Sequence, residues 1–351
     1  MKTLTANKRG ILYFFVHFSV ETACFYYLFS GAYGGEGWWL IALVFDAIAF
    51  LPQSVIGVIA DKFPRLPYGV IGLAMMLLAL FLPFGWVGLI ILTLGNATTH
   101  VDGAEKTLRG ANGKITPNAL FVGGGSFGVI TGRLLGVHAN QFTVLIPAIC
   151  IIFSVLLIIL FIRNVDENTV AGEGEKPELL SPDVANKNLP DYLIMVVVIV
   201  AVAVRAYIGY AVPTEWSVTE FHLILLYCYM GVGKSLGGVL ADKIGYKITT
   251  LISIVGALPF LILGNTYPVV SLTGTLLFSM TMPITVGIIY SVFPDLAGFA
   301  FGITTIGLFV GSLPAFCITL PDLITQQIVV TVLSAVALAL ILISLKRGKR
   351  V

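Results

Sequence analysis

Two titratable side chains, His17 and Glu21, lie inside one apolar stretch of the chain that runs from Gly10 to Ser30. If such a stretch crosses a lipid bilayer, an ionisable group within it is costly and needs a structural or functional reason. The i, i+4 spacing places both side chains on the same face of a helix. A desolvated carboxylate beside an imidazole can exchange protons near neutral pH, so we interpret the pair as a candidate proton-coupling site. The alternative is that Glu21 only neutralises a basic residue such as Arg205.

Polar residues also interrupt other apolar stretches. Asp46 and Gln53 are seven residues apart and therefore share a helix face. A shift of 181 residues along the chain superimposes Gln53 on Lys234, which either binds an anionic substrate or pairs with a carboxylate. Arg205, with Tyr207 close by, can bind a carboxylate or phosphate through two guanidinium nitrogens.

Asn96 and His100 lie one helical turn apart at the end of the apolar stretch 85–101. His100 either belongs to a binding site or only hydrogen-bonds to a loop carbonyl. The candidate substrate and coupling residues are therefore His17, Glu21, Asp46, Gln53, Asn96, His100, Arg205, Tyr207 and Lys234.

Motifs for cofactors and for covalent catalysis are missing from the sequence. The four cysteines occur singly in apolar surroundings, without the paired spacing of a zinc site or a disulfide framework. No nucleotide-binding loop, metal-ligand cluster or catalytic triad fits its context. We expect no cofactor, no resident metal, no nucleic-acid partner and no enzyme activity.

The composition is that of a polytopic membrane protein. Hydrophobic residues form 58% of the chain and charged residues 11%, against about 45–50% and about 25% in soluble domains. Apolar stretches separated by polar, glycine or proline breaks predict twelve spanning helices. Their expected ranges are 10–30, 38–60, 67–83, 85–101, 117–136, 141–163, 190–211, 221–241, 247–265, 267–291, 296–318 and 322–345.

One long hydrophilic segment, 164–189, separates the first six predicted helices from the last six. It is rich in Glu, Asp, Lys and Pro, and such a segment cannot bury enough apolar surface to fold alone. We expect a mobile cytoplasmic linker between an N-terminal six-helix half, 1–163, and a C-terminal six-helix half, 190–351. The predicted fold class is an all-α membrane protein with two pseudo-symmetric halves.

The distribution of positive charge predicts the orientation in the membrane. If the N-terminus is cytoplasmic, 17 of the 20 lysines and arginines lie in the N-terminal tail, at cytoplasmic loops and the helix ends that border them, or at the C-terminus, and none lies in an external loop. By the positive-inside rule, both termini are then cytoplasmic. Trp38, Trp39, Trp86 and Trp216 fall at the outer ends of the predicted helices, as expected for interfacial aromatic residues.

A short charged pattern occurs once in each half, directly after the second predicted helix of that half. The two copies contain an aspartate four residues after a glycine, followed by basic residues, and the aspartates are 181 positions apart. The residues of the first copy are Gly57, Asp61, Lys62 and Arg65, and those of the second are Gly238, Asp242, Lys243, Gly245 and Lys247. A carboxylate at such a helix end can accept hydrogen bonds from the N-terminus of an adjoining helix and hold this side closed.

Two groups of six helices with this repeated loop resemble the major facilitator superfamily. The resemblance covers the whole chain, although Pro64 and Leu66 depart from the family pattern in the first loop. It implies a central substrate cavity between the halves, lined mainly by helices 1, 4, 7 and 10, and transport by alternating access. The repeated loops would then act in gating.

Two short segments, Gly95–His100 and Pro294–Gly302, resemble the fosmidomycin-resistance-type exporters within that superfamily. We therefore expect a monomeric, lipid-embedded secondary transporter in a bacterial inner membrane. It would move a small organic solute, coupled to protons or another ion, with export favoured over uptake. The alternatives are an uptake permease for a small anionic metabolite and a non-transporting sensor or scaffold on the same fold.

Overall fold

The computed structural model describes residues 5–162, 183–185 and 189–347. The N-terminal helices are α1 (Ala6–Gly31), α2 (Trp38–Phe50), α3 (Pro52–Lys62), α4 (Tyr68–Leu80), α5 (Trp86–Leu108), α6 (Thr116–Val137) and α7 (Leu145–Ile162). The C-terminal helices are α9 (Asp191–Ala211), α10 (Glu220–Ile244), α11 (Tyr246–Ile254), α12 (Leu258–Leu263), α13 (Pro268–Ser279), α14 (Thr281–Val292), α15 (Ala297–Cys317) and α16 (Leu323–Ser344). The predicted all-α fold class is confirmed.

Each of the twelve predicted spans coincides with one helix or with two consecutive helices. The three divided spans are α2 with α3, α11 with α12, and α13 with α14. Within the described residues, nine single or joined helices are long and apolar enough to cross a membrane. Two further apolar helices, α4 and α7, are shorter.

The fourth predicted span ends later in the structure than in the sequence-based prediction. The prediction ended at residue 101, whereas α5 continues to Leu108. The acidic side chains in this extension have partners, which is why the helix can continue. The hydroxyl group of Tyr13 donates to Asp102 Oδ2 at 2.8 Å, and Arg109 Nε lies 3.1 Å from Glu105 Oε1.

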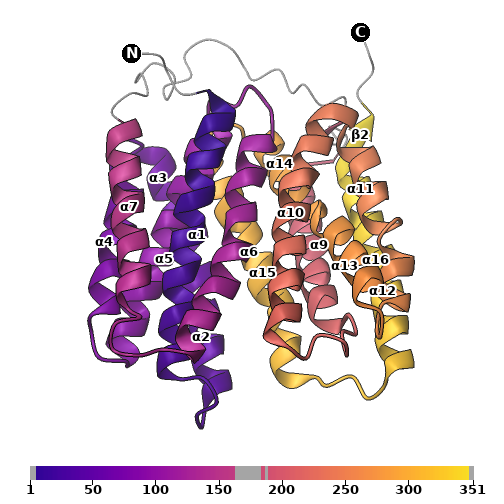
Figure 1. Ribbon diagram of the computed structural model, residues 1–351. Coiled ribbons are helices and arrows are strands. Elements are labelled where there is room, and N and C mark those ends of the chain that lie inside the picture. The colour runs from indigo at the N-terminus through magenta and orange to yellow at the C-terminus, as the bar shows by residue number, and fades with distance from the viewer. Residues whose placement is uncertain (1–4, 163–182, 186–188, 348–351) are drawn as a thin grey trace.

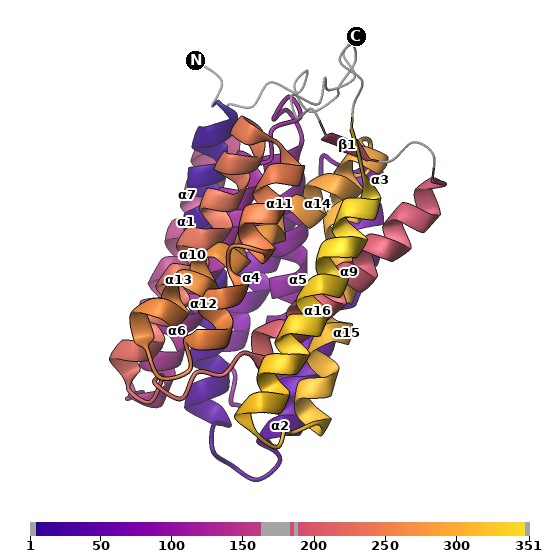
Figure 2. The same cartoon turned by 90° about the vertical axis from the view of Figure 1, so that its right-hand side faces the viewer.

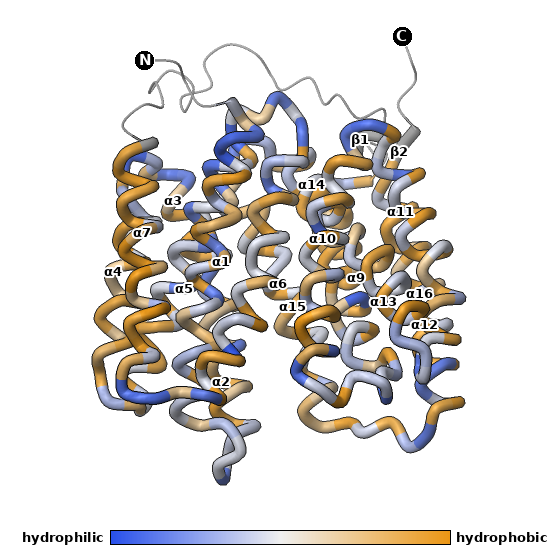
Figure 3. Tube along the Cα trace, viewed as in Figure 1, coloured by the Kyte–Doolittle hydropathy of each residue, from blue (hydrophilic) through white to orange (hydrophobic). Residues whose placement is uncertain are grey.

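The long helices run side by side, and the first residues of α1 and the last residues of α16 lie at the same end of them, which we call the terminal end (Figure 1). Figure 1 shows the N-terminal helices on one side of the molecule and most of the C-terminal helices on the other, while Figure 2 shows α16 and α9 from the side. Hydrophobic residues dominate along the helices, and hydrophilic residues gather in the loops at both ends (Figure 3). This distribution suits a protein whose middle is surrounded by lipid.

Glycines bring α1 and α6 into close contact. A Cβ atom added to Gly124, Gly128 or Gly132 would lie 2.2 to 2.4 Å from a carbonyl oxygen of α1, and at Gly136 it would lie 2.9 Å from one. Small residues at every fourth position allow two helix backbones to approach closely. The backbone of α1, which carries His17 and Glu21, is therefore held directly against α6.

Most of the predicted linker lies outside the described residues. Within it, strand β1 (Asp183–Ala185) pairs antiparallel with strand β2 (Leu345–Arg347), which directly follows α16. The sequence did not predict this short ladder. It joins the segment between the two groups of helices to the C-terminal end of the last helix.

Candidate functional site

A polar cluster lies between α1 and α5, near the middle of both helices. His17 Nε2 and His100 Nε2 are 2.8 Å apart, and Glu21 Oε1 lies 3.5 Å from the first and 3.3 Å from the second. Asn96 Nδ2 donates to Glu21 Oε1 at 3.3 Å and to Cys24 Sγ at 3.2 Å. The structure thus brings together four of the predicted site residues, His17, Glu21, Asn96 and His100, which we call the His–Glu cluster.

The side chains of the His–Glu cluster are largely buried. The side chains of His17 and His100 are each 9% exposed and that of Glu21 is 12% exposed. Because a buried carboxylate without a partner is strongly disfavoured, Glu21 needs the groups around it. The structure pairs Glu21 with two histidines, and Arg205, the basic partner considered from the sequence, makes no ion pair among the described residues.

The hydrogen bonds of the two imidazole rings determine which nitrogen carries the proton. His17 Nδ1 lies 2.8 Å from the carbonyl oxygen of Phe121, and His100 Nδ1 lies 3.0 Å from that of Asn96. A carbonyl oxygen only accepts, so both Nδ1 atoms must donate. In a neutral ring, Nε2 then carries a lone pair and no proton. Two nitrogen lone pairs and a carboxylate oxygen therefore converge on one point, which suits the binding of a single cation.

Helix α6 positions this cluster. It supplies the carbonyl group of Phe121, and a Cβ atom added to Gly125 would lie 2.3 Å from His17 Nε2. A Cβ atom added to Gly128 would lie 2.8 Å from the Cβ atom of Glu21. Only glycine leaves room for both side chains at these two positions.

Two phenylalanines separate the His–Glu cluster from the terminal end. Phe121 of α6 and Phe301 of α15 lie near the ends of their helices that face the terminal end, and both are buried. Their ring centroids are 5.9 Å apart, and the Phe121 ring lies 4.7 Å from that of His17. One ring belongs to the N-terminal helices and the other to the C-terminal helices, so this aromatic contact joins the two groups between the cluster and the terminal end.

The remaining predicted site residues lie outside this cluster. Lys234 Nζ donates to Ser126 Oγ at 2.9 Å and makes no ion pair among the described residues. The Arg205 guanidinium lies 5.9 Å from the centroid of the Phe278 ring, and its buried Nε atom has no hydrogen-bond partner. Tyr207, on the same helix, is half-buried.

Asp46 and Gln53 face different surroundings. Asp46 is half-buried on α2. Gln53 is fully buried, and its Nε2 atom donates to the carbonyl oxygen of Ala49 at 2.8 Å within the same span. Its Oε1 atom is buried without a partner among the described residues.

Asp61 links α3 to the start of α15. Its two carboxylate oxygens accept hydrogen bonds from the backbone N–H groups of Gly298 and Phe299, at 2.9 and 2.8 Å. Arg109 Nη2 donates to Asp61 Oδ1 at 2.8 Å and to the carbonyl oxygen of Asp295 at 3.1 Å. A carboxylate at a helix N-terminus accepts hydrogen bonds from the free N–H groups there, and its negative charge interacts favourably with the helix dipole. We call these contacts the Asp61 latch, because they join N-terminal to C-terminal helices at the terminal end.

Asp242 makes the reciprocal contact from α10 to the start of α6. It accepts hydrogen bonds from the backbone N–H groups of Ile115 and Thr116, both at 2.9 Å, and from the Thr116 hydroxyl group. We call these contacts the Asp242 latch. The two repeated aspartates therefore cap helices of opposite groups, and both lie at the terminal end.

The glycine four residues before each aspartate explains how the latches form. A Cβ atom added to Gly57 would lie 2.4 Å from the Gly298 backbone, and one added to Gly238 would lie 2.2 Å from Ala119 Cβ. Because residues i and i+4 share a helix face, the glycine lets the partner helix approach and the aspartate then reaches its N-terminus.

The basic residues of the repeated loops lie at the surface of the terminal end. Lys62, Arg65, Lys243 and Lys247 are exposed. Gly245 ends α10 with a φ of +88°, a conformation that favours glycine, whereas the first loop ends α3 at Phe63 with a φ of −125°. The departure of the first loop from the family pattern therefore changes how the helix ends, while Asp61 keeps its capping role.

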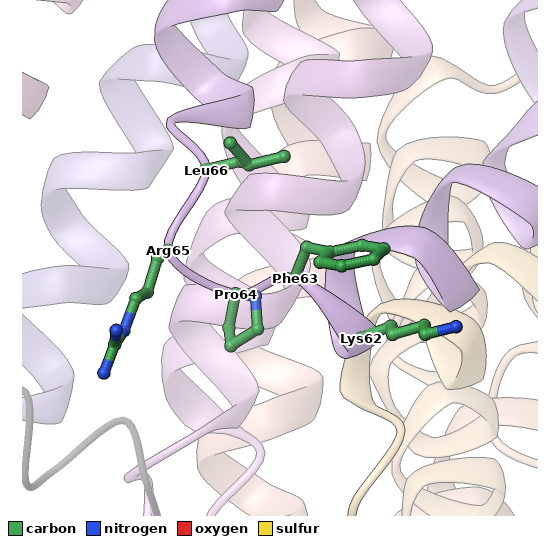
Figure 4. Close-up of a pocket in the computed structure, with 5 residues that line it drawn as sticks. All are labelled: Lys62, Phe63, Pro64, Arg65 and Leu66. Atoms are coloured by element: carbon green, nitrogen blue, oxygen red, sulfur yellow. The ribbon is translucent and has the colours of Figure 1, made fainter.

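A depression of about 370 Å³ lies over residues 62–66 of the first loop (Figure 4). In Figure 4 the side chains of Lys62 and Arg65 extend away from each other, so they do not converge on a common ligand. The depression lies at the surface of the terminal end and is separate from the His–Glu cluster. We therefore place the candidate site at the cluster.

Several residues of the site were not among the sequence-based candidates. Arg109, Thr116 and the Phe121–Phe301 contact depend on helices that are distant in sequence. The i, i+4 spacing of Glu105 and Arg109 gave one available signal, because it indicates a side-chain pair on one helix face. Nothing local in the sequence indicates that Arg109 also reaches Asp61.

Comparison with known proteins identifies the fold. No protein-family model matches the sequence, and no curated protein matches it. Among solved structures, the human organic anion transporter MFSD10 (TETRAN) is similar at 13% identity, with a TM-score of 0.66, over 96% of this chain and 99% of that chain. FucP, a major facilitator superfamily transporter in the outward conformation, is similar at 14% identity, with a TM-score of 0.65, over 95% and 97% of the two chains.

A bacterial homologue of the iron transporter ferroportin, in an outward-facing state, is similar at 14% identity, with a TM-score of 0.61. The match covers 97% of this chain and 98% of that chain. The chain therefore has the major facilitator superfamily fold, as the repeated loops predicted, and it is a membrane protein. At these identities the fold is shared, and the cargo has to be argued from this chain's own residues.

Proposed function

We propose that the chain is a secondary transporter that moves a small organic solute by alternating access. The observation that carries this proposal is the pair of reciprocal latches, in which Asp61 and Asp242 each cap a helix of the opposite group. Contacts of this kind can be broken without unfolding either group of helices. A buried polar site in the middle of the molecule with a breakable closure at one end is what alternating access requires.

We place the coupling site at the His–Glu cluster and propose the proton as the coupling ion. One proton held between His17 Nε2 and His100 Nε2, 2.8 Å apart, would turn two opposed lone pairs into a hydrogen bond. The resulting positive charge would lie 3.3 to 3.5 Å from Glu21 Oε1, which favours it. Movement of this charge with the solute would couple transport to the proton gradient.

Export of the solute is favoured over uptake only by the exporter-like segments of the sequence. An uptake permease for a small anionic metabolite is the second candidate, and one observation favours it. Arg205 is a buried cation and Lys234 a half-buried one, and neither has an ion-pair partner among the described residues, so an anionic solute could supply one.

The proposed topology has two six-helix halves, 1–163 and 190–351, joined by the cytoplasmic segment 164–189, in a bacterial inner membrane. The tryptophans at the helix ends opposite the terminal end support it. In a cysteine-free background, single cysteines at Gly35 and at Lys114 should label from opposite sides of the membrane, with Lys114 reached from the cytoplasm. Labelling of both from outside would overturn this orientation.

Replacement of one acid tests the coupling site. In proteoliposomes, with a solute identified by thermal-shift screening, Glu21→Gln should abolish uphill transport driven by a pH gradient and retain downhill exchange. The reason is that a neutral amide no longer stabilises the bound proton. Glu220→Gln is the matched control, because Glu220 is exposed at the opposite end and pairs with His138. A Glu21→Gln protein with unchanged pH dependence would remove the cluster from coupling.

A further inference from the structure

The three converging atoms of the His–Glu cluster form a set of metal ligands. His17 Nε2, His100 Nε2 and Glu21 Oε1 all lie within 4.8 Å of one another. We propose that these residues bind one divalent transition-metal ion. Two imidazoles and one carboxylate form a ligand set that suits first-row metals such as Zn²⁺, Fe²⁺ and Co²⁺.

The spacing of the three atoms fits such an ion. The separations of 2.8, 3.3 and 3.5 Å place the atoms on a circle with a radius of about 1.9 Å, slightly less than the metal–ligand bond length of about 2.0–2.1 Å. An ion bonded to all three would sit just out of their plane. Three ligands on one side leave further coordination positions for water or a solute.

The protonation states also match those of metal ligands. Both Nδ1 atoms donate to backbone carbonyl oxygens, of Phe121 and of Asn96, so both Nε2 lone pairs are free. Histidines that bind metals commonly donate their other N–H group to a carbonyl in this way, which fixes the ring orientation. The side chain of Asn96 holds the carboxylate of Glu21 by the same logic. The outer contacts of a metal site are therefore present around the ligands.

The sequence contains four histidines, which makes the assignment testable. Two of them, His17 and His100, belong to the cluster. The other two, His138 and His222, lie at the end opposite the terminal end, where His138 contacts Glu220 and His222 packs against Trp216. Replacing these two removes imidazole groups without touching the cluster.

The metal site uses the same residues as the proposed coupling site, so the inference rests on the proposed function. Its test is independent of transport. Binding is measured at equilibrium in detergent, without a gradient or a solute. A protein that transports but binds no metal refutes only the metal site. A protein that binds metal but transports nothing refutes only the transport proposal.

The experiment uses the full-length protein, purified with a histidine-free affinity tag, treated with a chelator and then dialysed. Titration with Co²⁺ at pH 7.5, followed by visible absorption, should give one ion per chain with a spectrum of nitrogen and oxygen ligands. Zn²⁺, followed by calorimetry, should compete for the same site. The variants His17→Gln, His100→Gln and Glu21→Gln should each bind at least tenfold more weakly.

The control variant, with His138→Gln and His222→Gln combined, should bind as the parent does. Cys24→Ser should also retain binding, because Cys24 contacts Asn96 and is not a ligand. Gly125→Ala should weaken binding, because its Cβ atom would overlap His17 Nε2. The proposal is overturned if the parent protein binds neither ion, or if the cluster variants bind as tightly as the control while eluting as the same monodisperse species.

Discussion

The Asp61 latch and the Asp242 latch have the same geometry but different partners. Each aspartate caps a helix of the opposite group through two backbone N–H groups. Asp61 also accepts from a guanidinium group, that of Arg109, whereas Asp242 accepts from the hydroxyl group of Thr116. The two copies of the loop therefore share the capping of a helix N-terminus and differ in the third donor.

The third donor changes what each latch is connected to. Arg109 follows α5, which carries His100 and Asn96, and it also contacts Glu105 of that helix. Thr116 begins α6, which carries the Phe121 carbonyl group. The Asp61 latch is therefore connected to the cluster through α5, and the Asp242 latch is connected to it through α6.

The largest effect is expected when the two aspartates are compared directly. Asp61→Asn removes a buried charge-assisted contact, which contributes about 1.5–3 kcal/mol, so the ratio of closed to open states should fall by roughly ten- to a hundredfold. Asp242→Asn also loses the carboxylate charge, but its third donor is the neutral Thr116 hydroxyl group and no guanidinium is left unpaired, so the change should be smaller. Spin labels at the exposed residues Arg65 and Lys243 would report the opening as a longer distance between the two groups of helices.

Equal distance distributions for the two variants would show that the guanidinium group adds nothing to the capping. Unchanged distributions in both variants would remove the latches from gating altogether. Lys62→Gln, at an exposed position next to Asp61, serves as the control for a change of charge in the same loop.

A smaller effect is expected from Arg109→Gln, which removes the difference between the two latches. In a double-mutant cycle, Arg109→Gln and Asp61→Asn should be non-additive by about 1 kcal/mol, because the two side chains are in direct contact. Arg109→Gln and Asp242→Asn should be additive, because those residues share no partner. The same spin-label distances would measure both cycles, and equal coupling energies would contradict this assignment.

The sequence was sufficient to predict the class of fold because its signals are local or repeated. Three signals can be read from single segments or from a comparison of two segments. They are the length of the apolar stretches, the positions of lysine and arginine, and the repeated glycine-to-aspartate pattern. The fold class is confirmed, and the fold is that of the major facilitator superfamily. The end of α5 was predicted too early, because the partners that allow Asp102 and Glu105 to remain helical are tertiary contacts.

The candidate site could be predicted only in part, for a physical reason. The spacing of His17 and Glu21 showed a shared face on one helix, but His100 is 83 residues away from His17 and only folding shows the contact. For the same reason the sequence indicated no metal site, since no spacing pattern links ligands from two helices. The sequence singled out Arg205 and Lys234 as charged residues inside predicted spans, but only the structure shows that they lie outside the cluster.

Helix α6 contacts both the Asp242 latch and the His–Glu cluster. Asp242 holds its first residues, and five positions further on its backbone orients His17. If α6 moves as one rigid body, the proposed occupancy of the cluster by a cation and the proposed closure of the terminal end would share one coupling free energy. By thermodynamic reciprocity, a bound cation that raises the ratio of closed to open states by some factor would bind more tightly to the closed state by the same factor.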